Sequence, residues 1–320
     1  MTDLDVFLQQ LLNGLSNGMI IALIAIGYTL VYGIIELINF AHGDLVMLGC
    51  FFALTLVEKL GLTADAAGGF PFYRHLALMF LLVAVFCGLL NWLIDYLAYR
   101  PLRESPRLAQ LVTAIGISFI FVNFGLFWGG MPLKVFNNGV AAAAPKDFPA
   151  LISADNLLGD SVIQFGMKDV MVFAVTVPLL ILLTLFVKYT KWGTAMRAVA
   201  QSPIAAKLMG IDVDKVIGST FIIGGALGGV GGVIYALYNN TIYFQMGYRI
   251  GMDGFVAAVL GGIGNLPGAM LGGLVIGLVR AMSDQYIATR WTSVIVYAIL
   301  ILVLVFRPSG LLGARVREKV

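Results

Sequence analysis

Long apolar runs are the feature of this 320-residue sequence that most restricts its fold. Crossing a bilayer as a helix takes about 20 predominantly apolar residues. Runs of that kind recur along the chain, at 11–35, 44–57 (short), 75–99, 108–130, 169–187, 217–238 and 290–306. Region 253–283 is also apolar, but "GGIGNLPG" divides it into two pieces. Only 12% of the residues are charged, against about 25% in soluble domains, so the sequence predicts an all-α, polytopic membrane protein with roughly eight membrane elements.

Charge and cysteine content exclude several classes of protein. The net charge of +3 is too small to indicate nucleic-acid binding. Cys50 and Cys87 both lie in apolar runs, which indicates free core thiols rather than a disulfide. The acidic start "MTDLDVFLQQ" lacks the basic region of a cleaved signal peptide, so the first hydrophobic segment is expected to stay in the mature protein.

Basic residues predict which loops face the cytoplasm, because Lys and Arg accumulate on that side. Twelve of the twenty fall in 100–107, in 188–215 and in the tail from Arg307. Placing all three stretches inside requires an even number of crossings between them. This arithmetic favours a re-entrant hairpin at 253–283 and puts the 131–168 loop outside. The side of the N-terminus stays open.

Two polar interruptions lie within the apolar sequence. "INFAHGDL" contains Asn39, His42, Gly43 and Asp44 and follows Glu36, while "GGIGNLPG" contains Gly264, Asn265 and Pro267. Irregular backbone at membrane depth is tolerated only inside protein or along a water-filled cavity. Paired interruptions in two halves of a chain point to inverted repeats around a central pathway.

The ionisable residues of the first break have two interpretations. Intramembrane ionisable groups are functional candidates by default, so Glu36, His42 and Asp44 could line a conduit or its gate. They could equally form an interfacial hydrogen-bonded set that holds the break. Asn39 and His42 are the better candidates for shaping the break itself.

The segment from Lys188 to Lys215 predicts short cytoplasmic helices. Thr194 to Val199 favours one helix, Pro203 can begin a second, and Gly210 is well placed to stop it. Because the second helix is too short to be stable alone in water, it is expected to dock, either on the membrane surface or on a partner protein.

Glycines elsewhere indicate helix packing. "GGALGGVGG" and "GAMLGGLVIG" place small residues four apart, which lets helix backbones approach closely in lipid. No Lys-Ser or Lys-Thr follows a Gly-rich loop, so the sequence has no ATP-binding P-loop. The sequence also lacks Cys and His residues at the spacing of a zinc site and lacks a Ser/His/Asp set, which argues against an enzyme.

Three blocks of sequence carry a resemblance to a known family. "GYTLVYGIIELINFAHGDLVMLG", "GTAMRAVAQSPIAAKLMGIDVDKVI" and "GFVAAVLGGIGNLPGAMLGGLVIGL" occur in family order and resemble the permeases of branched-chain amino acid ABC importers, of the LivH type. The resemblance covers about 11–313. It implies a single permease domain over 1–320, located in a bacterial inner membrane and surrounded by lipid.

The resemblance also implies partners and a mechanism. These are a LivM-like second permease, two cytoplasmic ATP-binding subunits and a periplasmic amino-acid-binding protein. ATP would be bound by the partners, with no cofactor or metal on this chain, and would drive alternating access. Residues 188–215 would contain the loop that couples to the ATPase, represented here by Thr194, Arg197, Ala198, Ala205 and Gly210. One departure is that relatives often have an acidic residue near Gln201-Ser202-Pro203, so a salt bridge at that place is not expected.

Two other functions fit the same sequence. One is a permease for urea, short amides or other amino acids, whose first block is very similar. The other is a stand-alone secondary carrier or channel, which would transport without partner subunits.

Overall fold

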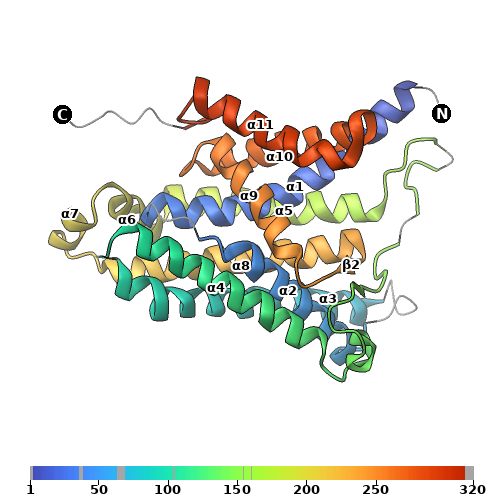
Figure 1. The fold of residues 1–320 in the computed structure, drawn as a ribbon, viewed down its shortest axis with the longest axis horizontal. Coiled ribbons are helices and arrows are strands. Elements are labelled where there is room, and N and C mark those ends of the chain that lie inside the picture. The colour runs from blue at the N-terminus through green and yellow to red at the C-terminus, as the bar shows by residue number, and fades with distance from the viewer. Residues whose placement is uncertain are drawn as a thin grey trace. The chain divides into compact units, whose positions relative to one another are not determined.

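The computed structural model describes residues 3–35, 39–62, 69–103, 105–153, 155–159 and 161–313, except the side chain of Arg107. Within them the fold is helical apart from one pair of two-residue strands (Figure 1). Six helical stretches are long and apolar enough to cross a membrane: Asp3–Ile35, Phe70–Leu102, Leu108–Gly129, Met167–Tyr189, Val213–Asn239 and Leu266–Phe306. This confirms a polytopic, all-α membrane protein. Two shorter helices of 18 and 16 residues, at His42–Lys59 and Met246–Gly261, are not among the six.

The chain forms two compact units, each assembled from separate stretches of sequence. Unit 1 takes the described residues within 1–36, 154–205 and 252–320, and unit 2 those within 37–153 and 206–251. Three of the four boundaries fall at the first polar break, within the short helix of the predicted coupling loop, and within a helix that precedes the second break; the fourth lies between residues 153 and 154. The prediction of one permease domain over 1–320 stays a prediction.

Unit 1 is organised around its first helix, whose buried residues all lie between Gly14 and Ile34. That helix packs along α10, and α5 and α6 also contact it. The helices wholly within this unit are α1 (Asp3–Ile35), α5 (Met167–Tyr189), α6 (Lys191–Gln201), α10 (Leu266–Ser283), the π-helical turn η5 (Asp284–Ala288) and α11 (Thr289–Phe306).

Unit 2 is organised around α8, which packs against α3 and α2. Strands β1 and β2 pair antiparallel, with Lys146 opposite Ile242 and Asp147 opposite Thr241. The elements wholly within it are α2 (His42–Lys59), α3 (Phe70–Ile94), the π-helical turn η2 (Asp95–Tyr99), η3 (Arg100–Leu102), α4 (Arg107–Gly129), η4 (Lys134–Gly139), β1 (Lys146–Asp147), α8 (Val213–Asn239) and β2 (Thr241–Ile242). Helices α7 (Pro203–Leu208) and α9 (Met246–Gly261) begin in one unit and end in the other.

Glycine stripes allow close helix packing in both units, as the sequence predicts. In unit 1, a β-carbon added to Gly273 of α10 would lie 2.5 Å from the backbone nitrogen of Ala22. In unit 2, one added to Gly225 of α8 would lie 2.5 Å from the carbonyl oxygen of Cys87, and one on Gly232 would lie 2.7 Å from that of Val46. These backbones are too close for any side chain, so the interpretation of the glycines as packing residues is confirmed.

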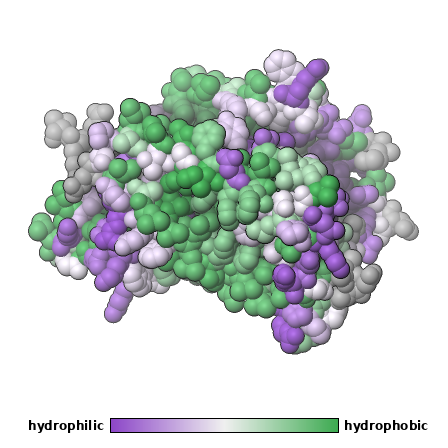
Figure 2. Space-filling model, turned by 60° about the horizontal axis from the view of Figure 1, so that its bottom comes forward, coloured by the Kyte–Doolittle hydropathy of each residue, from purple (hydrophilic) through white to green (hydrophobic). Residues whose placement is uncertain are grey.

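Large apolar side chains are exposed on the outer helices. Leu81 of α3, Phe119 of α4 and Leu182 of α5 are among them, and Figure 2 shows one face on which hydrophobic side chains predominate. Monomeric soluble proteins seldom expose continuous apolar patches larger than a few hundred Å². In a membrane protein such a surface is covered by lipid.

Candidate functional site

The first polar break belongs to unit 2 and is held by buried amides. Asn39, which is buried, accepts a hydrogen bond from the Tyr99 hydroxyl at 2.9 Å and donates one to Oδ1 of Asn91 at 3.2 Å. Asn91 in turn donates to the Phe221 carbonyl of α8 at 2.7 Å. A buried amide without partners would be costly, so this network explains why Asn39 is tolerated inside apolar sequence.

The first turn of α2 contains the other three described residues of this break. His42, Gly43 and Asp44 are all buried. Oδ2 of Asp44 accepts a hydrogen bond from the Ser118 hydroxyl at 2.5 Å, whereas its Oδ1 has no hydrogen-bond partner among the described residues. A carboxylate in the first helical turn is also favoured by the helix dipole. The fourth ionisable candidate, Glu36, lies outside the described residues.

Gly43 brings the start of α2 into backbone contact with the start of α9. A β-carbon on Gly43 would lie 2.5 Å from Cα of Gly251 and closer still to the Gly247 carbonyl oxygen. Only glycine fits this contact. The structure therefore brings Asn39, His42, Gly43 and Asp44 together at one buried helix start, while their position on a pathway stays a prediction.

The second break belongs to unit 1 and is closed by different means. Gly262 and Gly264 adopt φ values of +106° and +87°, which glycine reaches without strain. Asn265 caps α10, since its Oδ1 accepts from the Gly268 amide at 3.0 Å, and Pro267 lies in the first turn, where no N–H is needed. Asn39 does not cap α2 in this way, so the two breaks share their residue types but not their hydrogen bonding.

The C-terminal turn after α11 also secures the second break. The amides of Leu311 and Leu312 donate to the carbonyls of Leu260 and Gly261 at 2.8 and 3.0 Å. Nδ2 of Asn265 donates to the Leu312 carbonyl at 2.7 Å. The sequence analysis did not include this turn, although Gly310, with a φ of +76°, marks it as a structured segment rather than a free tail.

Helix α6, in the predicted coupling loop, forms a rigid corner with α5. Thr190 caps α6, accepting from the Gly193 amide at 3.0 Å. Nη1 of Arg197 donates to the carbonyls of Val187 and Lys188 at 2.9 and 3.0 Å, and its Nη2 donates to Thr194 at 3.3 Å. Arg197 therefore satisfies the last carbonyls of α5.

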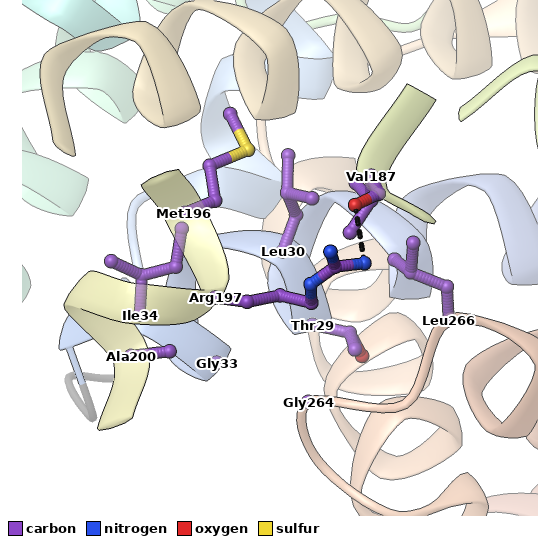
Figure 3. Close-up of a pocket in the computed structure, with 10 residues that line it drawn as sticks. All are labelled: Thr29, Leu30, Gly33, Ile34, Val187, Met196, Arg197, Ala200, Gly264 and Leu266. Carbon is purple, nitrogen blue, oxygen red and sulfur yellow. Dashed lines mark hydrogen bonds between the residues drawn. The ribbon is translucent and has the colours of Figure 1, made fainter. Parts of the chain in front are cut away.

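A small cavity lies beside this corner in unit 1. It measures about 80 Å³ and is lined by Thr29, Leu30, Gly33, Ile34, Val187, Met196, Arg197, Ala200, Gly264 and Leu266. In Figure 3 the Arg197 side chain extends toward the Val187 carbonyl, and Gly264 lies on the turn of the second break. The cavity lies between the coupling segment and the second break.

Helix α7 begins and ends as the sequence predicts. It starts at Pro203, and Gly210, at φ +81°, stops it while the Ile211 amide donates to the Ala206 carbonyl at 3.0 Å. Ala198 lies half-buried on α6, and Ala205 is exposed on α7. Three large apolar side chains are also exposed on or beside α7: Ile204 at 76%, Leu208 at 84% and Met209 at 82%.

Comparison with known proteins identifies the family. Residues 10–304 match the family model described as the permease component of the branched-chain amino acid transport system. The chain is 38% identical over 319 residues to the high-affinity branched-chain amino acid transport system permease LivH of Escherichia coli K12, covering 98% of both chains. This chain belongs to that family.

Of two further relatives, one is named for the same substrate class and one for a different class. The permease BraD of Pseudomonas aeruginosa, also named for branched-chain amino acids, is 37% identical over 320 residues and 98% of each chain. The nucleoside ABC transporter permease NupB of Lactococcus lactis is 24% identical over 288 residues, which is 82% of this chain and 77% of that protein. No solved structure was found to match the chain.

Membership in this family makes the chain a permease component of a transport system, not itself an enzyme. Within the described ranges, no group of three or more His, Cys, Asp or Glu residues could hold a metal ion.

The sequence analysis did not predict two sets of ion pairs in this permease. In unit 1, Arg280 of α10 forms an ion pair with Asp253 of α9 at 2.7 Å, with both side chains largely buried. In unit 2, Arg103 pairs with Asp95 at 2.7 Å and with Asp214 at 2.5 Å. The only sequence signal for the first pair is two opposite charges 27 residues apart within apolar sequence.

Proposed function

We propose that this permease is a pore-forming subunit of an ABC importer that carries branched-chain amino acids across a bacterial inner membrane. The observation that carries the proposal is the end-to-end similarity to the Escherichia coli permease LivH, at 38% identity over 98% of both chains. The exposed apolar helices and buried polar breaks are consistent with a subunit that lies in lipid and surrounds a pathway.

The proposed membrane topology has roughly eight elements, including two broken ones. The interruptions between α1 and α2 and between α9 and α10 support it. We infer that α9 and α10 form a re-entrant hairpin and that the two breaks belong to inverted repeats. Their different hydrogen bonding means that any such symmetry lies in the backbone path rather than in the side chains.

The pathway or gate is proposed to run along both breaks. Its residues are Glu36, Asn39, His42, Gly43, Asp44, Gly264, Asn265 and Pro267. Asp44 is the strongest of these, because one oxygen of its buried carboxylate has no hydrogen-bond partner among the described residues. A group that approaches this oxygen would relieve the desolvation cost that the fold now bears.

The proposed partners are a LivM-like second permease, two ATP-binding subunits and a periplasmic amino-acid-binding protein. We assign the docking surface for an ATP-binding subunit to α7. Ile204 and Leu208 lie one turn apart, and Met209 follows them, so that an exposed apolar ridge lies next to the exposed Ala205 and the Gly210 stop. Apolar anchors of this kind are the groups that gain most free energy when an amphipathic helix enters a groove.

The remaining coupling candidates have a different proposed role. Thr194 and Arg197 are engaged with the end of α5, and Ala198 lies on the α6 side of the loop. We infer that they hold α6 rigidly on α5, so that a displacement of α7 moves α6 and the neighbouring turn at Gly264 together. ATP-driven alternating access would then follow from the partners' nucleotide-dependent closure.

Charging the docking surface tests this assignment. In the permease purified from membranes with its partners, Leu208→Asp is expected to reduce retention of the ATP-binding subunits at least tenfold. The matched control is Leu158→Asp, which places the same charge at an exposed leucine of the 131–168 loop. Full retention and normal ATP-driven leucine uptake with Leu208→Asp would refute α7 as the docking element.

Substrate class is tested separately by exchanging the receptor. One relative, at 24% identity, is named as a nucleoside ABC transporter permease. We infer that selection among branched-chain amino acids, other amino acids and short amides lies mainly in the soluble receptor. Uptake should therefore follow the receptor's ligand when a receptor for a different amino acid is supplied, and unchanged selectivity would place selection in the permease.

A further inference from the structure

Four charged side chains form a cluster in unit 2 where α3 ends and α8 begins. Arg103 donates to both oxygens of Asp95, at 2.7 and 2.9 Å, and to Asp214 at 2.5 Å. Arg100 also donates to Asp214, at 2.5 Å. The Asp95 side chain is only 3% exposed, so its charge depends on Arg103 for compensation.

The cluster is connected to α7 by a very short piece of chain. Asp214 lies four residues after Gly210, and Asp212, which caps α8, lies between them. Hydrogen bonds from the amide and side chain of Lys215 lower the pKa of Asp212. The first turn of α8 is thus well capped, and a displacement at the end of α7 would be transmitted to Asp214 with little slack.

A π-helical turn joins the cluster to the first polar break. Asp95 and Tyr99 are the first and last residues of η2, and both are buried. The Tyr99 ring packs on Phe221 at 5.7 Å, and its hydroxyl donates to Asn39. π-Helical turns are rare and occur frequently at functional sites.

The hydrogen bonds then close a loop back onto α8. Asn39 donates to Asn91 of α3, and Asn91 donates to the Phe221 carbonyl. Polar contacts and one turn of backbone therefore connect Asp214, at the start of α8, to Asn39 at the break. Each member is partnered, as buried polar networks require if they are to specify one arrangement.

We propose that Asp214, Arg103, Asp95, Tyr99 and Asn39 form a positioning relay that couples the docking helix α7 to the chain break before α2. The inference rests on the proposed function, because it assumes that α7 docks on an ATP-binding subunit. Displacing α7 shifts Asp214, the arginines carry the shift to η2, and Tyr99 changes the position of Asn39. A network can transmit coupling only if its elements have two arrangements, so the test measures coupling rather than contact.

The test uses the complete transporter in proteoliposomes and measures ATP hydrolysed per leucine taken up. Asp214→Asn removes the charge that both arginines share, and Tyr99→Phe removes only the hydroxyl that reaches Asn39. Each is expected to raise the ratio about fivefold or more, the lower end of typical allosteric coupling. Asp214→Glu, which restores the charge, is expected to return the ratio toward the wild-type value.

Matched controls separate this role from a structural one. Asp212→Asn makes the same charge change at the cap of the same helix, where the ion pair with Lys215 is exposed. Tyr96→Phe removes a hydroxyl from the same turn, on an exposed ring that stacks on Trp92. Both controls are expected to keep the wild-type ratio.

The double variant decides between a relay and independent effects. If the residues act in series, Asp214→Asn combined with Tyr99→Phe should have no larger effect than the greater single effect. A wild-type ratio in an assembled Tyr99→Phe transporter, or single effects that multiply, would overturn the relay. If Asp214→Asn fails to assemble, Tyr99→Phe alone decides. Absence of ATP-driven uptake in the wild-type complex would instead contradict the proposed function.

Discussion

Substituting Gly43 tests the close contact between α2 and α9 most directly. In Gly43→Ala the new β-carbon would lie 2.5 Å from Cα of Gly251 and 2.8 Å from its amide nitrogen. An ordinary contact needs at least 3.4 Å, so the two backbones must separate by at least about 0.9 Å, and the Gly247 carbonyl oxygen lies closer still. Overpacking of this kind typically costs about 1–3 kcal/mol, and backbone atoms cannot yield as a flexible side chain can.

The matched control is Gly116→Ala in α4 of the same unit. No described atom lies within 4 Å of a β-carbon at Gly116, and alanine favours a helix over glycine by about 0.5–1 kcal/mol. The two variants make the same chemical change and should differ in unfolding free energy by at least about 1.5 kcal/mol. For a chain of 320 residues, that corresponds to a gap of at least about 2 °C in unfolding midpoint.

The assay is thermal unfolding of the purified permease in detergent, followed by leucine uptake in the reconstituted complex. Gly43→Ala is expected to unfold earlier than the wild type and to lose uptake, whereas Gly116→Ala retains both. Equal midpoints for the two variants would refute the claim that backbone contact fixes the start of α2.

Three further predictions concern other parts of the molecule. Arg280→Met leaves the buried Asp253 without its ion pair and should lower the unfolding free energy by about 3 kcal/mol, measured by denaturant titration; a loss below about 0.5 kcal/mol would contradict this. Gly210→Ala and Gly61→Ala both place alanine at positive φ, at +81° and +63°, and should cost about 1–2 kcal/mol each, but only Gly210→Ala should raise ATP use per leucine. Burial lowers the pKa of Lys146. At pH values between the folded and unfolded pKa, the unfolded state therefore binds more protons, and stability should rise with pH. Lys146→Met should flatten this rise, and an unchanged slope of stability against pH would refute the prediction.

Much of the fold could be predicted because a helix that crosses a bilayer needs a run of about 20 mainly apolar residues, which is visible in the sequence. The runs at 108–130, 169–187 and 217–238 correspond to Arg107–Gly129, Met167–Tyr189 and Val213–Asn239. Pro203 and Gly210 marked the limits of α7 because their backbone preferences act locally. The interruption at "GGIGNLPG" was visible for the same reason.

Other features depend on contacts between distant residues and could not be predicted. Helix α1 begins at Asp3 rather than near residue 11, because its polar first turns extend beyond the apolar run. Arg103 and Asp214 are 111 positions apart, and no local pattern relates them. The hydroxyl of Tyr99 donates to Asn39 from the π-helical turn η2, and no residue type in the sequence predicts that turn.

The two breaks differ in whether the role of their asparagine could be predicted from neighbouring sequence. Asn265 caps the helix that it precedes, a role that its sequence position predicts. Asn39 has the same residue type before a helix, yet its amide is used by Tyr99 and Asn91. Whether a polar residue caps or joins a tertiary network depends on what packs beside it.

Dependence of leucine flux on partner ATP-binding subunits tests the central claim most directly. Proteoliposomes would contain either the purified permease alone or the permease with its second permease, ATP-binding subunits and receptor, with ATP supplied on the side of the ATP-binding subunits. We expect leucine accumulation only in the complete vesicles and only with hydrolysable ATP. Rapid leucine flux through the permease alone would contradict the account and identify a stand-alone carrier.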